Sequence, residues 1–316
     1  MINSTLQALE QLGYGKSPVP HEKLKQLDDE GFCLLEPSDH YYDWLGADLN
    51  ALRSRVDELV EKEGEKAGFE GREEYFKKGK RYEPLARRLG NLPNKDPIFR
   101  KFSTIPELLW CTYHVIKTDI MISSANSREP IKNYHNSPAK CGQQRLHIDW
   151  TARYDERAPF DCVIAMMYLE DSNEKNGAIK YVPRTHKLLG WPDQYVNPYE
   201  EHPDTVQVPA KAGSIIVVNT HLWHRGAENI DGSRRRIINT IYRNRKLKQG
   251  LNQKLYLSEK TKKEMNEVEK YFFKIREQDE DQNEKIVGPG NDYRKWLLEN
   301  PNNNYSKSND ITIKHI

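Results

Sequence analysis

The feature that most constrains the fold is a series of six short segments between residues 119 and 244, each rich in β-branched residues or alternating in polarity. Gly, Pro, Asn and Asp, which favour turns, separate them. Short strands at such spacing are typical of two antiparallel sheets packed as a sandwich or jelly roll. The segments are DIMISSAN, QQRLHIDW, DCVIAMMYLE, AIKYVP, SIIVVNT and RRIINTIYRN.

Helices are expected on both sides of this β region. Residues 21–31 have an amphipathic pattern that Gly31 ends, directly before the strand-like segment FCLLE. Asp48 can cap a helix over 49–64, in which apolar residues recur on one face. Pro106 suits the first turn of a further helix, because its missing N–H is not needed there.

The chain is interpreted as one domain over residues 1–316, since a chain of this length can bury a large core. Its parts are a helical N-terminal layer at 1–118, a jelly-roll core at 119–246 and a helical C-terminal extension at 247–316. Within the first part, the charge-dense segment 61–101 is interpreted as exposed excursions at the rim of a site. The fold class predicted is therefore mainly β, with flanking helices and a double-stranded β-helix core.

Composition excludes several classes of protein. Forty-nine basic and 47 acidic residues leave a net charge of +2, which is too balanced for a general nucleic-acid binder. The apolar runs are far shorter than the roughly 18–20 residues of a membrane span. No signal peptide is readable, and the four cysteines form no CxxC pair. A cytoplasmic protein with reduced thiols is expected, with neither nucleic acid nor membrane as a partner.

The strongest chemical motif is LHIDW, followed later by a second histidine. His147 and Asp149 are two residues apart, so in a strand their side chains point to the same face. His224 follows an apolar strand 75 residues after Asp149, far enough for the sheet to return beside the first pair. Two histidines and a carboxylate that leave one face of an ion open suit non-haem Fe(II) oxygenases. Each histidine alone would more often be a packed or hydrogen-bonded residue.

A run of three arginines follows His224. Arg235 comes eleven residues after this histidine, on the expected next strand. A guanidinium there can bind a distal carboxylate through a bidentate fork while the other end of a 2-oxo acid chelates iron. By strand alternation, Arg235 faces the side opposite to Arg234 and Arg236. Either Arg235 or its two neighbours can therefore face the site and bind the carboxylate.

These residues resemble the phytanoyl-CoA dioxygenase (PhyH-type) family of Fe(II)/2-oxoglutarate oxygenases. The resemblance extends from about residue 21 to residue 245 and includes much more than the histidines and the acid. It departs at Arg184–Thr185, where Gly–Ser is usual, and in the long C-terminal extension. The segments that carry it are HEKLKQLDDEGFCLLE, FSTIPELLWCTYHVIKTDIMI, YLEDSNEKNGAIKYVPRTHK and GSIIVVNTHLWHRGAENIDGSRRRIINTIYR.

The resemblance implies a jelly roll that binds Fe(II) through His147, Asp149 and His224, with Arg235 on the C5 carboxylate of 2-oxoglutarate. It implies an oxygenase that uses O2 and releases succinate and CO2. Family members that halogenate lack the carboxylate ligand, so Asp149 favours hydroxylation or another oxidation. In this family the protein orients the reactants and excludes water.

Several further residues are candidates for ligand contacts. Thr220 and Gln144 can hydrogen-bond 2-oxoglutarate, whereas Asn229 is expected to fix its loop and His186 to bind no metal. The substrate is expected to be a small polar metabolite, with segments 61–101 and 128–142 at the rim of its site. Four arginines are candidates for an anionic group of the substrate, or else scattered surface charges: Arg128, Arg145, Arg153 and Arg157.

Two other functions remain open at this point. A non-catalytic jelly-roll protein could bind a metal or ligand without turning it over, although a structural site gains nothing from open coordination positions. A zinc isomerase or hydrolase of the same fold would act without O2 and release no succinate.

Overall fold

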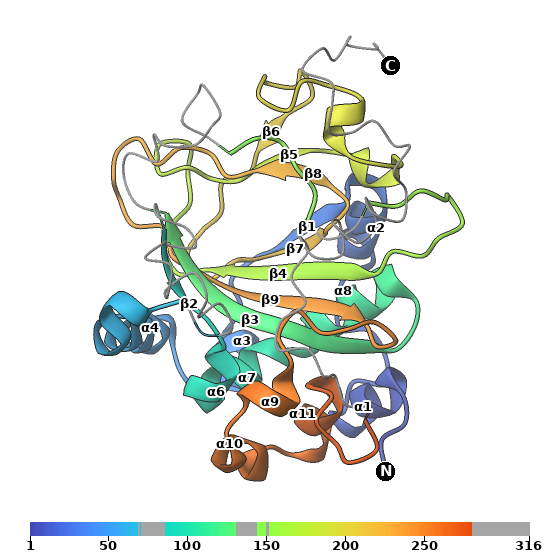
Figure 1. Ribbon diagram of the computed structural model, residues 1–316, viewed down its shortest axis with the longest axis vertical. Helices are drawn as coiled ribbons and strands as arrows, with labels where there is room; N and C mark the ends of the chain where they lie inside the picture. The colour runs from blue at the N-terminus through green and yellow to red at the C-terminus, as the bar shows by residue number, and fades with distance from the viewer. Residues whose placement is uncertain (69, 71–85, 131–143, 150–151, 280–316) are drawn as a thin grey trace.

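The structure, a computed structural model, describes residues 1–68, 70, 86–130, 144–149 and 152–279. Its centre is a six-stranded sheet of order β1-β7-β4-β9-β3-β2, in which all neighbours are antiparallel. A three-stranded sheet of order β6-β5-β8 faces it (Figure 1). The large sheet consists of β1 (Phe32–Leu35), β2 (Ala86–Leu89), β3 (Ile120–Pro130), β4 (Cys162–Tyr168), β7 (Ile215–Asn219) and β9 (Ile237–Asn244).

The small sheet is extended by a segment that is not itself a regular strand. Its strands are β5 (Lys180–Val182), β6 (Val206–Gln207) and β8 (Trp223–Arg225). Residues 144–149 run antiparallel to β8 and bond to it through a single bridge between His147 and His224. The two sheets and this segment form the predicted double-stranded β-helix.

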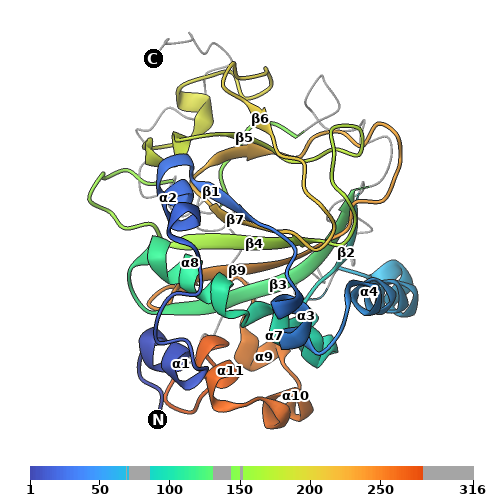
Figure 2. The ribbon, with the colours of Figure 1, turned by 180° about the vertical axis from the view of Figure 1, so that it is seen from behind.

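Helices cover the side of the large sheet that faces away from the small sheet, as α7, α8 and α11 show (Figures 1 and 2). Among all the described helices, wherever they lie, those before the β core are α1 (Thr5–Gln11), α2 (His21–Glu30), α3 (Asp39–Leu45), α4 (Leu49–Glu63), η1 (Gly64–Lys66), α6 (Leu92–Lys95), α7 (Pro97–Ser103) and α8 (Pro106–Ile116). Those that follow are η2 (Thr185–Lys187), η3 (Pro192–Gln194), α9 (Gln253–Tyr256), α10 (Glu259–Glu264) and α11 (Glu267–Phe272).

Strand β4 is apolar along its whole length because both of its faces are buried. Val163, Ala165 and Met167 belong to the core shared with the helices. Ile164 and Met166 belong to a second core, which lies between the two sheets. Alternation along one central strand therefore separates a structural face from the face that lines the site.

Most of the predicted elements are confirmed. Five of the six predicted strand segments contain β3, β4, β5, β7 and β9. Asp48 caps α4 by accepting a hydrogen bond from the backbone N–H of Ala51 at 2.8 Å. Gly31 ends α2 in the left-handed conformation, with φ of 86°. Of the segment QQRLHIDW, the described residues 144–149 form an isolated bridge to β8 at His147 and no regular strand, so the strand predicted there is wrong.

The interpretation of 61–101 as exposed excursions is wrong for its second half. Leu89, Leu92 and Phe99 are fully buried. β2 pairs with the edge of the sheet at β3, and α7 lies under the same sheet, so the apolar residues between the charges are core residues. Residues 69 and 71–85 lie outside the described part of the chain.

The C-terminal extension is helical where the structure describes it. The predicted charged helix is divided into α10 and α11 at Met265, and α11 packs against α1. Tyr271 and Phe272 are fully buried, and the Tyr271 hydroxyl lies 3.3 Å from the Thr5 hydroxyl. Among the described helices, none is long and apolar enough to cross a membrane.

Gly31 offers a direct test of how α2 meets the site-bearing loops. A Cβ at this position would lie 2.6 Å from Nδ1 of His186 and 3.0 Å from a methyl carbon of Leu222, in addition to the strain of a positive φ. We expect Gly31→Ala to lower the free energy of unfolding by about 2–4 kcal/mol in urea titrations. Gly13→Ala is the matched control, because Gly13 has φ of 88° and nothing within 4 Å, so about 1 kcal/mol is expected. Equal losses in the two variants would contradict this account of the contact.

Candidate metal centre

Backbone pairing brings the two histidines of the predicted triad together. The N–H of His147 donates to the carbonyl of His224 at 3.0 Å, and the N–H of His224 donates to the carbonyl of His147 at 2.9 Å. Residues that face each other in this way project their side chains to the same side. The two imidazole rings accordingly lie with their centroids 4.4 Å apart.

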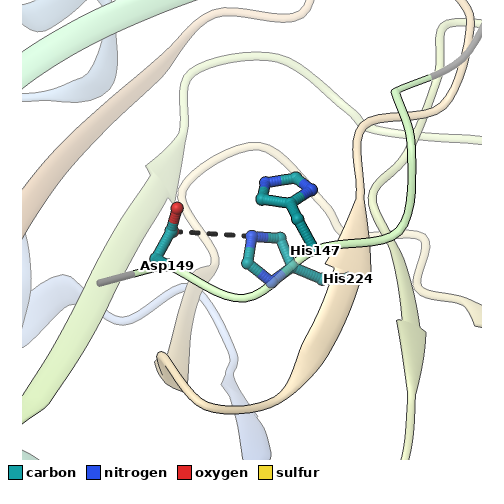
Figure 3. Close-up of side chains that lie close together, drawn as sticks. All are labelled: His147, Asp149 and His224. Carbon is teal, nitrogen blue, oxygen red and sulfur yellow. Dashed lines mark ion pairs between the residues drawn. The ribbon is translucent and has the colours of Figure 1, made fainter. Parts of the chain in front are cut away.

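Asp149 completes the cluster (Figure 3). Its backbone N–H donates to the carbonyl of Thr220 at 3.0 Å, which keeps it in register two residues after His147. Oδ2 of Asp149 lies 3.5 Å from Nε2 of His224, and one donor atom from each of the three residues lies within 4.8 Å of the others. All three side chains are only partly buried, so the donors face an accessible space.

Each imidazole is held by its second nitrogen. Nδ1 of His147 lies 2.9 Å from the carbonyl of Arg145, and Nδ1 of His224 lies 2.9 Å from the carbonyl of Leu222. A carbonyl only accepts hydrogen bonds, so Nδ1 carries the proton in both rings. In the neutral rings, the lone pair is therefore on Nε2, the nitrogen that His224 turns toward Asp149.

The electrostatics of the cluster favour a cation. Burial lowers the pKa of His147 to about 4, and the neighbouring His224 adds to this effect. Burial acts to raise the pKa of Asp149, but the attraction of His224 outweighs it and lowers that pKa to about 2. Burial acts to lower the pKa of His224, yet the carboxylate of Asp149 outweighs it and raises that pKa. Near neutral pH, Asp149 is ionised and His147 is neutral, the states in which both can ligate a metal.

The cluster opens on a cavity of about 100 Å³ between the two sheets. Arg235 and Gln144 line this cavity, but Thr220 is not among its lining residues. The hydroxyl of Thr220 instead donates to the carbonyl of Cys162 at 3.1 Å. The other lining residues are Arg128, Pro130, His147, Asp149, Ile164, Met166, Ile179, His224, Gly226, Ala227, Ile237 and Asn239.

The three successive arginines face alternate sides. Arg235 has 2% of its surface exposed, lines the cavity, and donates from Nε to the carbonyl of Asn176 at 3.1 Å. It lies two residues before the start of β9 instead of on it, which differs from the prediction, but the three arginines still face alternate sides. Arg234 and Arg236 both form ion pairs with Asp57 of α4, each at 2.8 Å, on the other side.

Acidic residues hold both outer arginines. Arg234 donates to Glu129 of β3, with Nε 2.6 Å from the carboxylate, and Arg236 donates from Nε to Glu170 at 2.9 Å. Arg236 is almost fully buried, whereas Arg234 keeps 41% of its side chain exposed. These ion pairs tie the segment before β9 to α4 and the sheet, with Arg235 left facing the cavity.

The remaining candidates have structural contacts. The side-chain nitrogen of Asn229 donates to the carbonyl of Ser233 at 2.9 Å, so Asn229 fixes its loop as expected. Nε2 of His186 lies 3.1 Å from the carbonyl of Asp28, away from the triad. Gln144 accepts a hydrogen bond from the N–H of Gly226 at 2.9 Å while lining the cavity.

Of the four candidate arginines for the substrate, Arg128 alone lines the cavity. Arg145 is exposed, and Arg157 keeps 94% of its side chain exposed. Arg153 donates to the carbonyls of Glu156 and Ala158. Sequence reasoning did not identify Asn239, which also lines the cavity. The alternation along β9 was the available signal, but it could be used only once the pairing of β9 with β4 was known.

The comparisons with known proteins agree with this fold and site. The family model described as phytanoyl-CoA dioxygenase (PhyH) matches residues 28–237. HygX from Streptomyces hygroscopicus, solved with nickel and 2-oxoglutarate bound, is 17% identical and superposes with a TM-score of 0.53, over 73% of this chain and 89% of that one. SnoK, a non-haem α-ketoglutarate-dependent carbocyclase from nogalamycin biosynthesis, is 18% identical with a TM-score of 0.51, over 72% of this chain and 85% of that one. The comparison with curated proteins gives no match.

The family match, over residues 28–237, spans more than half of the chain, so this protein belongs to the phytanoyl-CoA dioxygenase family. It is a non-haem oxygenase that depends on Fe(II), 2-oxoglutarate and O2 and acts on a small-molecule metabolite. At below 20% identity the solved structures show the fold alone.

Proposed function

We propose that His147, Asp149 and His224 hold the Fe(II) ion, that Arg235 binds the distal carboxylate of 2-oxoglutarate, and that the enzyme hydroxylates its substrate. One observation carries this assignment: donor atoms within 4.8 Å of one another open on a cavity that a buried arginine also lines. Two imidazoles and one carboxylate are a donor set suited to ferrous iron, with positions left for other ligands.

Arg235 suits a carboxylate for electrostatic reasons. Its guanidinium is almost fully buried, and an ionic attraction is stronger there than in water. Its planar fork can form two parallel hydrogen bonds to one carboxylate. The ion pairs of Arg234 and Arg236 on the opposite side support this geometry, because they fix the backbone on both sides of Arg235.

When bound, the iron would supply the oxidising chemistry, in which 2-oxoglutarate is decarboxylated to succinate and CO2 while the substrate is oxidised. The residues of the chain orient the reactants and exclude water. Ile164, Met166, Ile179 and Ile237 give the cavity an apolar wall. Asp149 keeps the carboxylate that halogenating relatives lack, which supports hydroxylation.

For the substrate we propose a small molecule with an anionic group that Arg128 contacts. Arg128 lines the same cavity as the triad, and its charge helps to lower the pKa values of both His147 and Asp149. HygX has been solved with hygromycin B bound, which supports a small molecule as the substrate of this chain.

We also propose that residues 1–316 act as one domain in the cytoplasm. The packing of α11 against α1 supports a single domain, because it places the C-terminal extension in contact with the N-terminal helical layer. Cys33, Cys111 and Cys162 are buried free thiols, which supports a reducing compartment.

The triad assignment is tested by metal and co-substrate binding. In an anaerobic titration with Fe(II) and 2-oxoglutarate, the wild-type protein should develop a weak visible charge-transfer band. Asp149→Ala and His224→Ala should lose that band and at least 99% of succinate formation, because each removes a ligand. His186→Ala is the matched histidine control and should retain both. Wild-type turnover in either triad variant would contradict the assignment, and a metal-loaded wild type without the band would favour a non-catalytic binding protein.

The role of Arg235 is tested by comparing the neighbouring arginines. Arg235→Ala should raise the KM for 2-oxoglutarate by about 100-fold or more, since it removes a buried charged hydrogen-bond partner. Arg234→Ala should raise it less than threefold, because Arg234 faces α4. The measurement is the rate of succinate release against 2-oxoglutarate concentration. The reverse order of effects would show that the assignment of the arginines is wrong.

Arg128 is tested on substrates found by a mass gain of one oxygen in metabolite mixtures. Arg128→Gln should raise the KM of an anionic substrate at least tenfold and leave that of 2-oxoglutarate unchanged. Arg157→Gln, on a highly exposed residue, is the control. An unchanged KM for substrate in Arg128→Gln would overturn the proposed contact.

A further inference from the structure

A second cavity, of about 450 Å³, lies behind the metal centre. Trp223 lines it, whereas the next residue of β8, His224, lines the cavity of the metal centre. Neighbouring residues of a strand point to opposite faces, so β8 separates the two cavities. Of the described residues, none lines both. The lining of this outer cavity consists of Val182, Pro183, Arg184, Thr185, Leu188, Tyr195, Val196, Asn197, Glu200, Glu201, His202, Pro203, Asp204 and Trp223.

Hydrogen bonds hold the walls of the outer cavity in place. One wall is the small sheet, and the other is the connection from β5 to β6, which lies beyond that sheet in Figure 1. The N–H of Trp223 donates to the hydroxyl of Thr185 at 3.0 Å, and the N–H of Leu146 donates to the carbonyl of Pro198 at 2.7 Å. The cavity is therefore shaped before a ligand binds, and its volume is within the roughly 300–1,000 Å³ of small-molecule sites.

The inner part of the outer cavity is apolar. Val182 and Trp223 have 1% and 2% of their surface exposed and belong to one small core. Leu188, Tyr195 and Val196 pack against this core and are only partly buried. The ring centroid of Tyr195 lies 5.5 Å from that of Trp223. An apolar or aromatic group that enters the cavity is therefore removed from water.

The rim of the outer cavity carries negative charge. Glu200, Glu201 and Asp204 line the cavity and are exposed. Lys180 forms an ion pair with Glu201 at 3.1 Å. Within the described part of the chain, no ion pair joins Glu200 or Asp204 to a cation. The side-chain nitrogen of Asn197 donates to Glu200 at 2.8 Å and orients that carboxylate.

Two arginines lie near this rim without pairing with its acids. Arg184 lines the cavity, but its Nε lies 3.8 Å from Glu30 of α2, and 76% of its side chain is exposed. Arg225 is fully buried, donates to the backbone carbonyl of Glu200, and is not among the lining residues. The carboxylates of Glu200 and Asp204 are therefore available to a cation that enters from solvent.

We propose that the outer cavity is a second ligand site, which binds a small organic cation with an apolar or aromatic body. The body packs beside Tyr195 above the floor that Trp223 forms. The positive group lies at the rim, beside Glu200 and Asp204. An anion of the same shape would place its charge against these carboxylates, so the rim selects for a cation. The inference does not depend on the proposed function, because β8 separates this site from the triad.

The test uses two probes that share an apolar body and differ in charge. Dissociation constants of naphthylmethylammonium and of naphthylacetate are measured by isothermal titration calorimetry on the full-length protein at low ionic strength. The cation should bind about tenfold more tightly than the anion, or better. The double variant Glu200→Gln/Asp204→Asn should bind the cation about fivefold more weakly or worse, since it removes two modest surface attractions. Glu65→Gln/Glu174→Gln removes the same charge from exposed residues outside the cavity, and should leave the constant within about twofold of wild type.

A further variant separates the outer cavity from the metal centre. Asp149→Ala should bind the cation with the wild-type constant, because Asp149 lines the other cavity. Loss of cation binding in Asp149→Ala overturns the inference, since it places the probe at the metal centre. The inference is also overturned if the wild type binds the anion as tightly as the cation, if it binds no cation, or if Glu200→Gln/Asp204→Asn keeps the wild-type affinity. None of these results changes the assignment of the triad.

Discussion

The reciprocal backbone hydrogen bonds between His147 and His224 are the interaction on which the site depends. These bonds form the single bridge between residues 144–149 and β8, the edge strand of the three-stranded sheet. They also place both imidazoles on the same face. The bond from Asp149 to the carbonyl of Thr220 extends the same register by two residues. The main chain thus brings the three donor side chains together, and Nε2 of His224 comes within 3.5 Å of the carboxylate of Asp149. The carbonyls of Arg145 and Leu222 then orient the two rings.

The large sheet provides the opposite wall of the cavity, and the segment before its strand β9 provides the cation, Arg235. Because β4 is buried on both faces, the helices stabilise one side of the sheet while the other side is available to a ligand. The same alternation divides the three arginines, with Arg235 toward the cavity and its two neighbours in ion pairs with α4 and the sheet. Asp57 contacts both outer arginines, so one residue of α4 helps to hold the segment that presents Arg235.

Much of this arrangement could be predicted from the sequence. The prediction that His147 and Asp149 share a face required only an extended chain at these residues. It is confirmed, although the segment forms an isolated bridge instead of a regular strand. Charge density misled the interpretation of 61–101, because long charged side chains surround apolar residues such as Phe99 that belong to the core. Thr220 was expected to contact the co-substrate, yet its carbonyl holds Asp149.

The central claim is that the triad holds a ferrous ion with one side open to 2-oxoglutarate. The most direct measurement is a crystal structure of the anaerobic protein with Fe(II) and 2-oxoglutarate, in which anomalous scattering at the iron edge locates the ion. We expect a single strong peak bounded by Nε2 of both histidines and the carboxylate of Asp149, with the distal end of the co-substrate directed to Arg235. An iron peak elsewhere, or a fourth protein ligand that closes the open side, would contradict it.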